Sequence, residues 1–383
     1  MVRVTTNGVL RNYKSDLMRS ANNLNYARNM VLTQRNFNSY AEDPASATLA
    51  FQLRRSFWRN SDHLTNSQAV TNKFSAAFSA MNTVSDDLGN AANSSVLRGL
   101  NTPTGSGREP LGQQLVQLAD EIVQSMNSKY GDTFIFAGAD GLNVPFSWDE
   151  TTGNLLYRGV NVNAGGVPKP DTPEPADPND PNDPNLTDEW KAYYADQEDL
   201  KKLETMANEA TYVDLGLGMK EDINGNLITS SAYNSALSGL NALGYGVDED
   251  GDPKNVASIV KELGEILSRC RKDAADGESA DQDGAWASEQ DQIDANRLQL
   301  KLKDALSNLT SKKTELSTKV SFLNDNTERL EDNADMLNEQ ILSIEQVDLA
   351  DAITSFSWAQ YCYNAALKVG NSILSQSLID YMS

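Results

Sequence analysis

The strongest constraint on the fold is an apolar stripe near the C-terminus, in which the spacing alternates between four and three residues. Its members are Leu302, Leu306, Leu309, Lys313, Leu316, Val320, Leu323, Thr327, Leu330, Ala334, Leu337, Ile341 and Ile344. All but Lys313 and Thr327 are apolar, although only 39% of the chain is hydrophobic. Heptad spacing sustained over this length predicts a long coiled-coil helix, which needs a partner helix to cover its stripe.

The distribution of the 12 prolines limits where partner helices can lie. Most of them fall between Pro168 and Pro184, whereas residues 1–43 and 254–383 contain none. A proline inside a helix costs about 3 kcal/mol, so long helices are expected at the two ends of the chain and not in its middle.

Residues 10–35 continue the four-three step and are the first candidate partner. Their stripe consists of Tyr13, Leu17, Ser20, Leu24, Ala27 and Val31. A second helix is expected to begin at Asp43-Pro44 and to run towards Leu88, because aspartate accepts from unpaired N–H groups and proline suits the first helical position. A third helix is expected over 111–129.

The last predicted helix covers residues 348–383 and carries large apolar side chains close to its end. Its stripe is formed by Leu349, Ile353, Phe356, Tyr363, Ala366, Ile373, Leu374, Leu378 and Tyr381. A single helix with such a face must dock either on its own protein or on a neighbouring one.

The middle of the chain has shorter elements. Strands are expected over 133–136 and 155–158, helices over 190–210 and 255–275, and weaker strands over 213–217 and 227–229. Residues 165–188 repeat Asp-Pro-Asn, which predicts an exposed linker or a disordered insertion.

These elements predict a mainly α fold: an elongated coiled-coil bundle with paired N- and C-terminal helices, plus a smaller β-containing variable insertion domain. The N-terminal helix, 1–40, is expected to pair with the C-terminal helix, 346–383. Residues 41–135 and 285–345 are expected to form the long helical bundle, and residues 136–284 the solvent-facing domain with its acidic linker 165–188.

Catalytic and metal-binding motifs are not recognisable. The single histidine, His63, lies in a polar stretch and suits a surface position better than a catalytic one. The acidic run 248–252 lacks the glycine and glutamate that a calcium loop places at its sixth and twelfth positions, so an exposed turn is favoured. We expect no cofactor, no metal and no enzymatic activity.

Two cysteines, Cys270 and Cys362, do not make a disulfide framework, and no feature supports a bridge between them. Cys362 lies in a helical pattern, which predicts a buried or half-buried free thiol. No apolar run is long enough for a membrane-spanning helix, and the N-terminus does not resemble a cleaved signal peptide. Export would then use a route that reads no such signal.

The formal charge of −22 argues against nucleic-acid binding, which needs clustered Lys and Arg side chains. The charge is uneven: residues 1–40 are basic, whereas residues 140–200 are strongly acidic. The basic end suits a solvated helix face better than a specific anion site. The acidic middle suits an exposed, solubilising surface.

Four elements in chain order resemble the flagellin family. They are Arg3-Val4-Thr5-Thr6-Asn7-Gly8; Asp43-Pro44-Ala45-Ser46-Ala47; Tyr130-Gly131-Asp132-Thr133-Phe134-Ile135-Phe136-Ala137-Gly138 with Pro145-Phe146; and Asp348-Leu349-Ala350-Asp351-Ala352-Ile353-Thr354 with Ser375-Gln376-Ser377-Leu378-Ile379-Asp380-Tyr381-Met382. The second departs from the family pattern, because Glu42 stands where aspartate is usual and the preceding Ser-Gly is absent. The third is similar to the signature of the family's hook–filament junction proteins, with filament flagellin as the alternative. The middle, 161–284, resembles no known family.

The resemblance implies a structural adaptor of the bacterial flagellum, located outside the cell and exported by the flagellar type III apparatus. Implied partners are like subunits in a ring or helical assembly, a neighbouring hook-associated protein, flagellin and an export chaperone, with no nucleic acid and no membrane insertion. Termini that fold on assembly would supply the interface. The implied interface residues are Leu10, Tyr13, Leu17, Leu24, Val31, Asp43, Pro44, Leu349, Ile353, Phe356, Tyr363, Ile373, Leu374, Leu378 and Tyr381. A flagellin-like enzyme would instead need catalytic residues within 161–284.

Overall fold

The computed structural model describes residues 6–102, 105–175, 183, 185–269, 286 and 288–382, without the side chains of residues 6, 7, 9, 105, 106 and 373–382. The chain divides into two compact units. Unit 1 comprises Met1–His63 and Arg329–Ser383, and unit 2 comprises Leu64–Glu328. None of the described helices is both long and apolar enough to cross a membrane.

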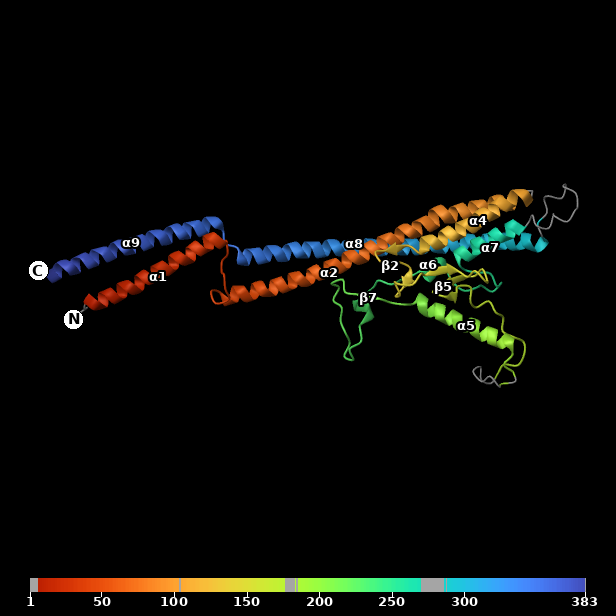
Figure 1. Ribbon diagram of the computed structural model, residues 1–383, viewed down its shortest axis with the longest axis horizontal. Coiled ribbons are helices and arrows are strands. Elements are labelled where there is room, and N and C mark those ends of the chain that lie inside the picture. The colour runs from red at the N-terminus through yellow and green to blue at the C-terminus, as the bar shows by residue number, and fades with distance from the viewer. Residues whose placement is uncertain are drawn as a thin grey trace. The chain divides into compact units, whose positions relative to one another are not determined.

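Helices dominate both units (Figure 1). The α-helices are α1 (Thr6–Thr33), α2 (Pro44–Asn82), α3 (Asn90–Asn101), α4 (Gly105–Met126), α5 (Asp188–Ala207), α6 (Gly239–Leu243), α7 (Val256–Arg269), α8 (Glu289–Glu345) and α9 (Leu349–Met382). A π-helical segment, η1 (Thr83–Gly89), joins α2 to α3, and a 3₁₀ turn, η2, covers Thr229–Ser231. Helices α2 and α8 contribute residues to both units.

The strands are short and lie in unit 2. They are β1 (Lys129–Tyr130), β2 (Thr133–Phe134), β3 (Ala137–Gly138), β4 (Phe146–Trp148), β5 (Leu155–Tyr157), β6 (Val160–Asn161), β7 (Tyr212–Val213), β8 (Tyr233–Asn234) and β9 (Leu237–Ser238). All pairings are antiparallel: β1 with β2, β3 with β9, β4 with β5 and β6, and β7 with β8. The predicted mainly α fold with a smaller β-containing insertion is confirmed.

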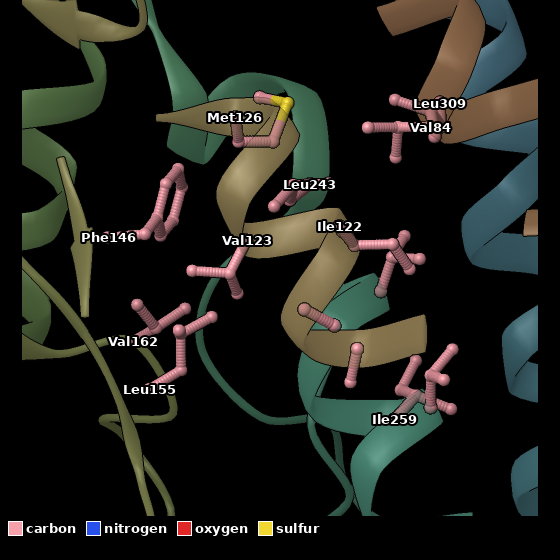
Figure 2. Close-up of a cluster of buried hydrophobic side chains, with 14 of the residues drawn as sticks. Val84, Ile122, Val123, Met126, Phe146, Leu155, Val162, Leu243, Ile259 and Leu309 are labelled. Atoms are coloured by element: carbon pink, nitrogen blue, oxygen red, sulfur yellow. The ribbon is translucent and has the colours of Figure 1, made fainter. Parts of the chain in front are cut away.

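The core of unit 2 lies between α4, α7 and α8 and extends to the small sheets. Figure 2 shows Ile122 and Val123 of α4 in this cluster, with Phe146 of β4 and Ile259 of α7. Each of these four side chains is at most 5% exposed. Burial of large apolar side chains contributes about 1.5–3 kcal/mol each, so this cluster is the main source of stability for unit 2.

The heptad stripe of α8 is buried along one line. Every seventh residue from Leu302 to Leu330 is at most 4% exposed, and the alternate positions are half-buried. Its two polar members contact the neighbouring helical segments: Lys313 Nζ lies 2.6 Å from Asp86 Oδ1 of η1, and Thr327 Oγ1 lies 3.0 Å from Ser67 Oγ of α2. The polar interruptions of the stripe therefore pair across the helix contact and do not break it.

The flagellin-like element around residue 130 and Pro145-Phe146 forms part of the core. The Asn127 side chain bonds both backbone groups of Phe146, at 2.8 Å to its oxygen and 2.9 Å from its nitrogen. The Phe146 ring packs edge-on against Tyr157 at 5.0 Å, and the Tyr157 hydroxyl donates to Phe136 O. Gly138 has φ +73°, and a side chain there would collide with the Glu209 carboxylate. This element therefore has a structural role in unit 2.

Several predicted boundaries are wrong. Helix α4 begins at Gly105 and contains Pro110, although the sequence predicts a start at 111. The extra turn is held by Arg108, whose side chain donates to Gly99 O at 3.3 Å and lies 4.4 Å over the Trp286 ring. The second predicted helix changes at residue 83 into η1, which no local sequence signal marks.

The predicted strands are also shorter than expected. Of the predicted strand 133–136 only Thr133 and Phe134 form a strand, β2. The next strand, β3, follows at Ala137 and pairs with β9, a partner about a hundred residues away. Of 213–217 only Val213 is in a strand, and Leu227 makes an isolated bridge with Glu221. Such long-range pairing does not follow from local alternation of residues.

The acidic linker is partly ordered. Thr172 accepts a hydrogen bond from the indole N–H of Trp190 on α5, which is fully buried, and Lys169 pairs with Glu174 at 3.0 Å. Residues 165–175 therefore lie against α5. The prediction of an exposed or disordered linker does not anticipate this contact. The rest of that prediction falls largely on residues 176–182 and 184, which lie outside the described residues.

Candidate assembly interface

In unit 1 the two terminal helices, α1 and α9, pack side by side and run antiparallel (Figure 1). The Tyr13 hydroxyl near the start of α1 donates to Ala366 O in the middle of α9 at 3.1 Å. At the other end of the pair, Val347 N donates to Gln34 O at 3.2 Å. The pairing of the N- and C-terminal helices that the sequence predicts is confirmed.

Small residues of α9 allow the two helices to approach closely. Ala352 is fully buried, Ala359 and Ala366 follow at intervals of seven, and Gly370 is buried one turn further. A Cβ atom at Gly370 would lie 1.9 Å from the hydroxyl oxygen of Tyr13. Glycine is therefore required at 370 for Tyr13 to keep its place across the seam.

The chain between α1 and α2 is tied to the junction of α8 and α9. The Asn36 side-chain amide donates to Ile344 O at 2.9 Å and to Gln346 O at 3.0 Å, and Asn36 N donates to Glu345 O at 2.8 Å. Arg54 of α2 also forms an ion pair with Glu345. These contacts hold together the two chain segments that make up unit 1, although the bonded residues are some 300 positions apart in sequence.

Asp43 caps α2, and Pro44 is its first residue, as the sequence predicts. The Asp43 carboxylate accepts from the backbone N–H groups of Ala45 and Ser46, both at 3.1 Å. Hydrogen bonds from Ser46, through its side chain and its backbone, hold the pKa of Asp43 below its usual value. Both residues therefore act on helix initiation, and a direct contact with a neighbour is not needed to explain them.

The apolar residues predicted for the interface divide into three groups. Tyr13, Leu17, Leu24, Val31, Phe356 and Tyr363 are half-buried at spacings that match the α1–α9 seam. Leu10, Leu349 and Ile353 are exposed, with 38–47% of their surface accessible. Ile373, Leu374, Leu378 and Tyr381 belong to α9, but their side chains lie outside the described part of the chain.

Several exposed apolar side chains of unit 1 were not singled out from the sequence. On α9, Trp358 and Tyr361 are 69% and 67% exposed, and their rings stack at 5.9 Å. On α1, Leu32 and Met18 are 72% and 61% exposed. These residues lie off the four-three stripe, so the stripe does not predict them. Large exposed apolar side chains of this kind make the α1–α9 pair a candidate interaction surface.

Cys362 is an exposed free thiol, so the prediction of a buried or half-buried position is wrong. The next residue, Tyr363, takes the seam position, which turns Cys362 towards solvent. Cys270 lies outside the described residues, so its state stays a prediction. His63 is a half-buried residue of α2.

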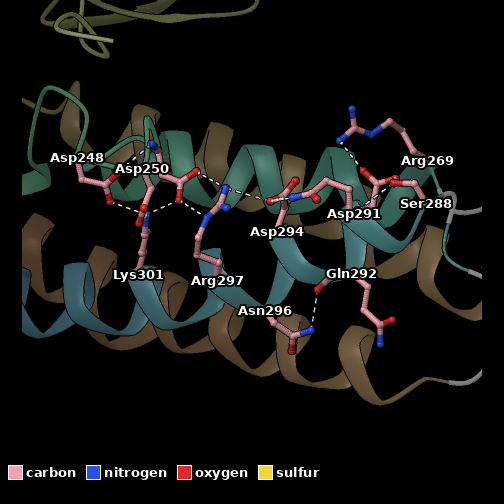
Figure 3. Close-up of polar contacts among 12 residues, drawn as sticks. Asp248, Asp250, Arg269, Ser288, Asp291, Gln292, Asp294, Asn296, Arg297 and Lys301 are labelled. Atoms are coloured by element: carbon pink, nitrogen blue, oxygen red, sulfur yellow. Dashed lines mark hydrogen bonds and ion pairs between the residues drawn. The ribbon is translucent and has the colours of Figure 1, made fainter. Parts of the chain in front are cut away.

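The acidic run 248–252 of unit 2 is held by protein cations (Figure 3). Carboxylate oxygens of Asp248, Asp250 and Asp252 lie close enough together to hold a metal ion, but Lys301 of α8 bonds all three. Arg297 also binds Asp252 in a bidentate manner at 2.7 and 2.9 Å. Burial opposes the charge of Lys301, yet the three carboxylates outweigh it and raise the Lys301 pKa. The cluster is thus an ion-pair clamp between this turn and α8.

Comparisons with known proteins give the family context. Residues 300–382 match the family model described as bacterial flagellin C-terminal helical region. No curated protein matches the sequence.

Among solved structures, the chain resembles one from Vibrio parahaemolyticus that is assigned to the flagellar hook-associated proteins. The identity is 14% and the TM-score is 0.51, over 79% of this chain and 99% of that one. FlgL of Bacillus cereus has 14% identity over 76% of this chain and 99% of its own, with a TM-score of 0.42. Hook-associated protein 3 of Legionella pneumophila has 12% identity over 76% and 98%, with a TM-score of 0.44. The chain therefore has the fold of the Vibrio protein, and its residues 300–382 match the flagellin C-terminal helical region.

Proposed function

We propose that this protein is a structural adaptor subunit of the bacterial flagellum that joins hook-associated proteins to the flagellin filament by helical self-assembly. The observation that carries the proposal is the α1–α9 pair, whose inner seam is closed while its outer faces expose Trp358, Tyr361 and Leu32. An isolated protein gains nothing from such exposure, whereas a subunit covers these faces with its neighbours.

The match of residues 300–382 to the flagellin C-terminal region supports the same function, because this segment includes most of α8 and the whole of α9. The likeness to a flagellar hook-associated structure supports the junction over the filament. The proposed partners are further copies of this chain, a hook-associated protein and flagellin, with a chaperone during export. The proposed location is the flagellum, outside the cell.

The proposal is tested by removing the outer aromatic pair. A strain that lacks the gene is complemented with the wild type or with Trp358→Ala/Tyr361→Ala. We expect the gene-deleted cells to carry hooks without filaments in electron micrographs, and the double variant to leave most cells in that state. The matched control is Leu142→Ala, which shortens a side chain of unit 2 that is 79% exposed, and it should restore filaments.

The circular dichroism spectrum and the amount of secreted protein distinguish failed assembly from failed folding or export. Normal filaments in the gene-deleted strain would exclude the junction role. Long filaments formed by the purified wild-type protein alone would instead favour the alternative, a filament flagellin.

A further inference from the structure

The part of unit 1 built from α2 and α8 has opposite charges on its two helices. Between Pro44 and His63, α2 contains three arginines and one acid, Asp62. Between Arg329 and Glu345, α8 contains five acids and one base. Arg54 and Glu345 pair within the chain. The side chains of Arg55 and Arg59 on α2, and of Asp332, Asp335 and Glu339 on α8, are exposed.

The basic face of α2 is formed by Arg55, Trp58 and Arg59. Their positions, i, i+3 and i+4, place them on one side of the helix. All three are exposed, and Trp58 is accessible over 66% of its surface. This face therefore combines two cations with a large apolar ring.

The acidic face of α8 is formed by Asp332, Asp335, Met336 and Glu339. The spacing i, i+3, i+4 and i+7 again places them on one side. All four are exposed, and Met336 is accessible over 50% of its surface. The buried residues Leu330 and Ile341 occupy the other side of α8, so the acidic face looks away from the helix packing.

Within the described part of the chain, neither arginine of the basic face has an ion pair, and none of the three carboxylates of the acidic face has one. Three acids on adjacent turns repel one another, and so do two neighbouring arginines. A partner of opposite charge would relieve both, and each face has an apolar centre, Trp58 or Met336, suited to a thioether–aromatic contact.

We propose that the basic face of α2 in one copy binds the acidic face of α8 in the next copy, so that copies join head to tail. The inference rests on the proposed function and names the contact through which like subunits meet. A second copy fits because both faces occur on the same chain. A contact that repeats one face against itself would set like charges together, whereas a head-to-tail contact sets opposite charges together and builds a ring or helix.

The test uses charge reversal in the full-length protein, in the gene-deleted strain. Arg55→Glu/Arg59→Glu makes both faces acidic, and Asp332→Lys/Asp335→Lys makes both faces largely basic. Each double variant alone should lose motility. The quadruple variant, whose two faces have exchanged sign, should regain it. Cells that express the two double variants together should also regain it, because the copies can alternate.

Arg55→Lys/Arg59→Lys is the matched control and should remain motile. All variants are checked for secretion and for helical content, so that loss of motility can be assigned to assembly. Full motility of both double variants would overturn the inference, while the adaptor function would stand if Trp358→Ala/Tyr361→Ala still fails. Loss of motility that neither the quadruple variant nor co-expression rescues would assign the two faces to a different subunit type, and it would also overturn the inference.

Discussion

The two units bury their apolar residues in different ways. In unit 2, Trp190, Phe74 and Phe136 are at most 1% exposed, and the small sheets and α7 close the core. In unit 1, the α1–α9 seam is lined partly by alanine and glycine, while Trp358 and Tyr361 are more than two-thirds exposed. Unit 2 thus packs its largest aromatic side chains in a closed core, whereas unit 1 has a narrow seam of small residues and exposes two large aromatic rings.

Because of this difference, we expect mutations in unit 2 to affect mainly stability and mutations on the outer face of unit 1 to affect mainly assembly. Mutations in the closed core should change the free energy of unfolding, because a cavity left in a packed interior is only partly refilled. Mutations of the exposed aromatic residues should change assembly with little effect on folding. A variant in each unit can therefore test whether the two properties are separate.

Leu263→Ala should have the largest effect on stability. Leu263 of α7 is fully buried in the unit 2 core, and such a truncation costs about 3–5 kcal/mol. Trp358→Ala removes a larger side chain but should cost less than about 0.5 kcal/mol, because the residue is exposed. Urea unfolding followed by circular dichroism measures both. Equal losses of stability would contradict the division between a closed and an open unit.

Asp252→Asn should have the next largest effect. The Asp252 side chain is only 6% exposed and binds both Arg297 and Lys301. Removing its charge weakens the ion pairs of both cations and should lower the free energy of unfolding by about 2–3 kcal/mol. This is less than for a fully buried ion pair, because both cations keep some contact with water. Thermal melting should show the loss. Asp250→Asn, at an exposed member of the same cluster, is the control and should cost less than about 1 kcal/mol.

Gly370→Ala tests the seam of unit 1. The added methyl group would collide with the Tyr13 side chain and displace its hydroxyl from Ala366 O. Overpacking of this kind costs about 1–3 kcal/mol, and it should appear as faster hydrogen exchange in α1 and α9 but not in α7. Tyr13→Ala combined with Gly370→Ala should cost less than the sum of the two single changes. Strict additivity would argue against contact between these positions.

The sequence predicts the helices of both ends because periodicity and proline placement are local signals. The stripe from Leu302 to Leu330 and the start of α2 at Pro44 follow from spacing and capping alone. The pairing of β3 with β9 and the turn held by Arg108 do not, since they depend on residues far away in the chain. Local patterns contain no information about such partners.

The candidate interface could be predicted less well than the fold. A four-three stripe identifies the face that packs inside the helix pair, so it selected Phe356 and Tyr363, which lie on the seam. Trp358 and Tyr361 lie off that stripe, so the stripe does not predict them. The sequence signal that does indicate them is a pair of aromatic residues one helical turn apart. Cys362 also lies off the stripe, next to the seam residue Tyr363, and is therefore exposed instead of buried.

The smallest expected effect is that of Glu262→Gln on α7, and it has a definite pH dependence. Burial, together with the nearby charges of Asp252 and Glu265, raises the pKa of Glu262 above its usual value. A raised acid pKa contributes stability below the unfolded value of about 4.3, and this contribution is lost as the pH rises through the folded value.

At pH 7 glutamine should therefore be more stable than the ionised glutamate, and the melting temperature should rise by less than about 2 °C, since the side chain is only half-buried. Below about pH 4 both side chains are neutral, and the difference should vanish. Melting curves of the two proteins from pH 3 to pH 8 measure this, with Glu150→Gln, at an exposed glutamate of unit 2, as the control. A stabilisation that persists at pH 3 would show that the gain does not come from the buried charge, and the closed core of unit 2 would then tolerate an ionised carboxylate at no cost.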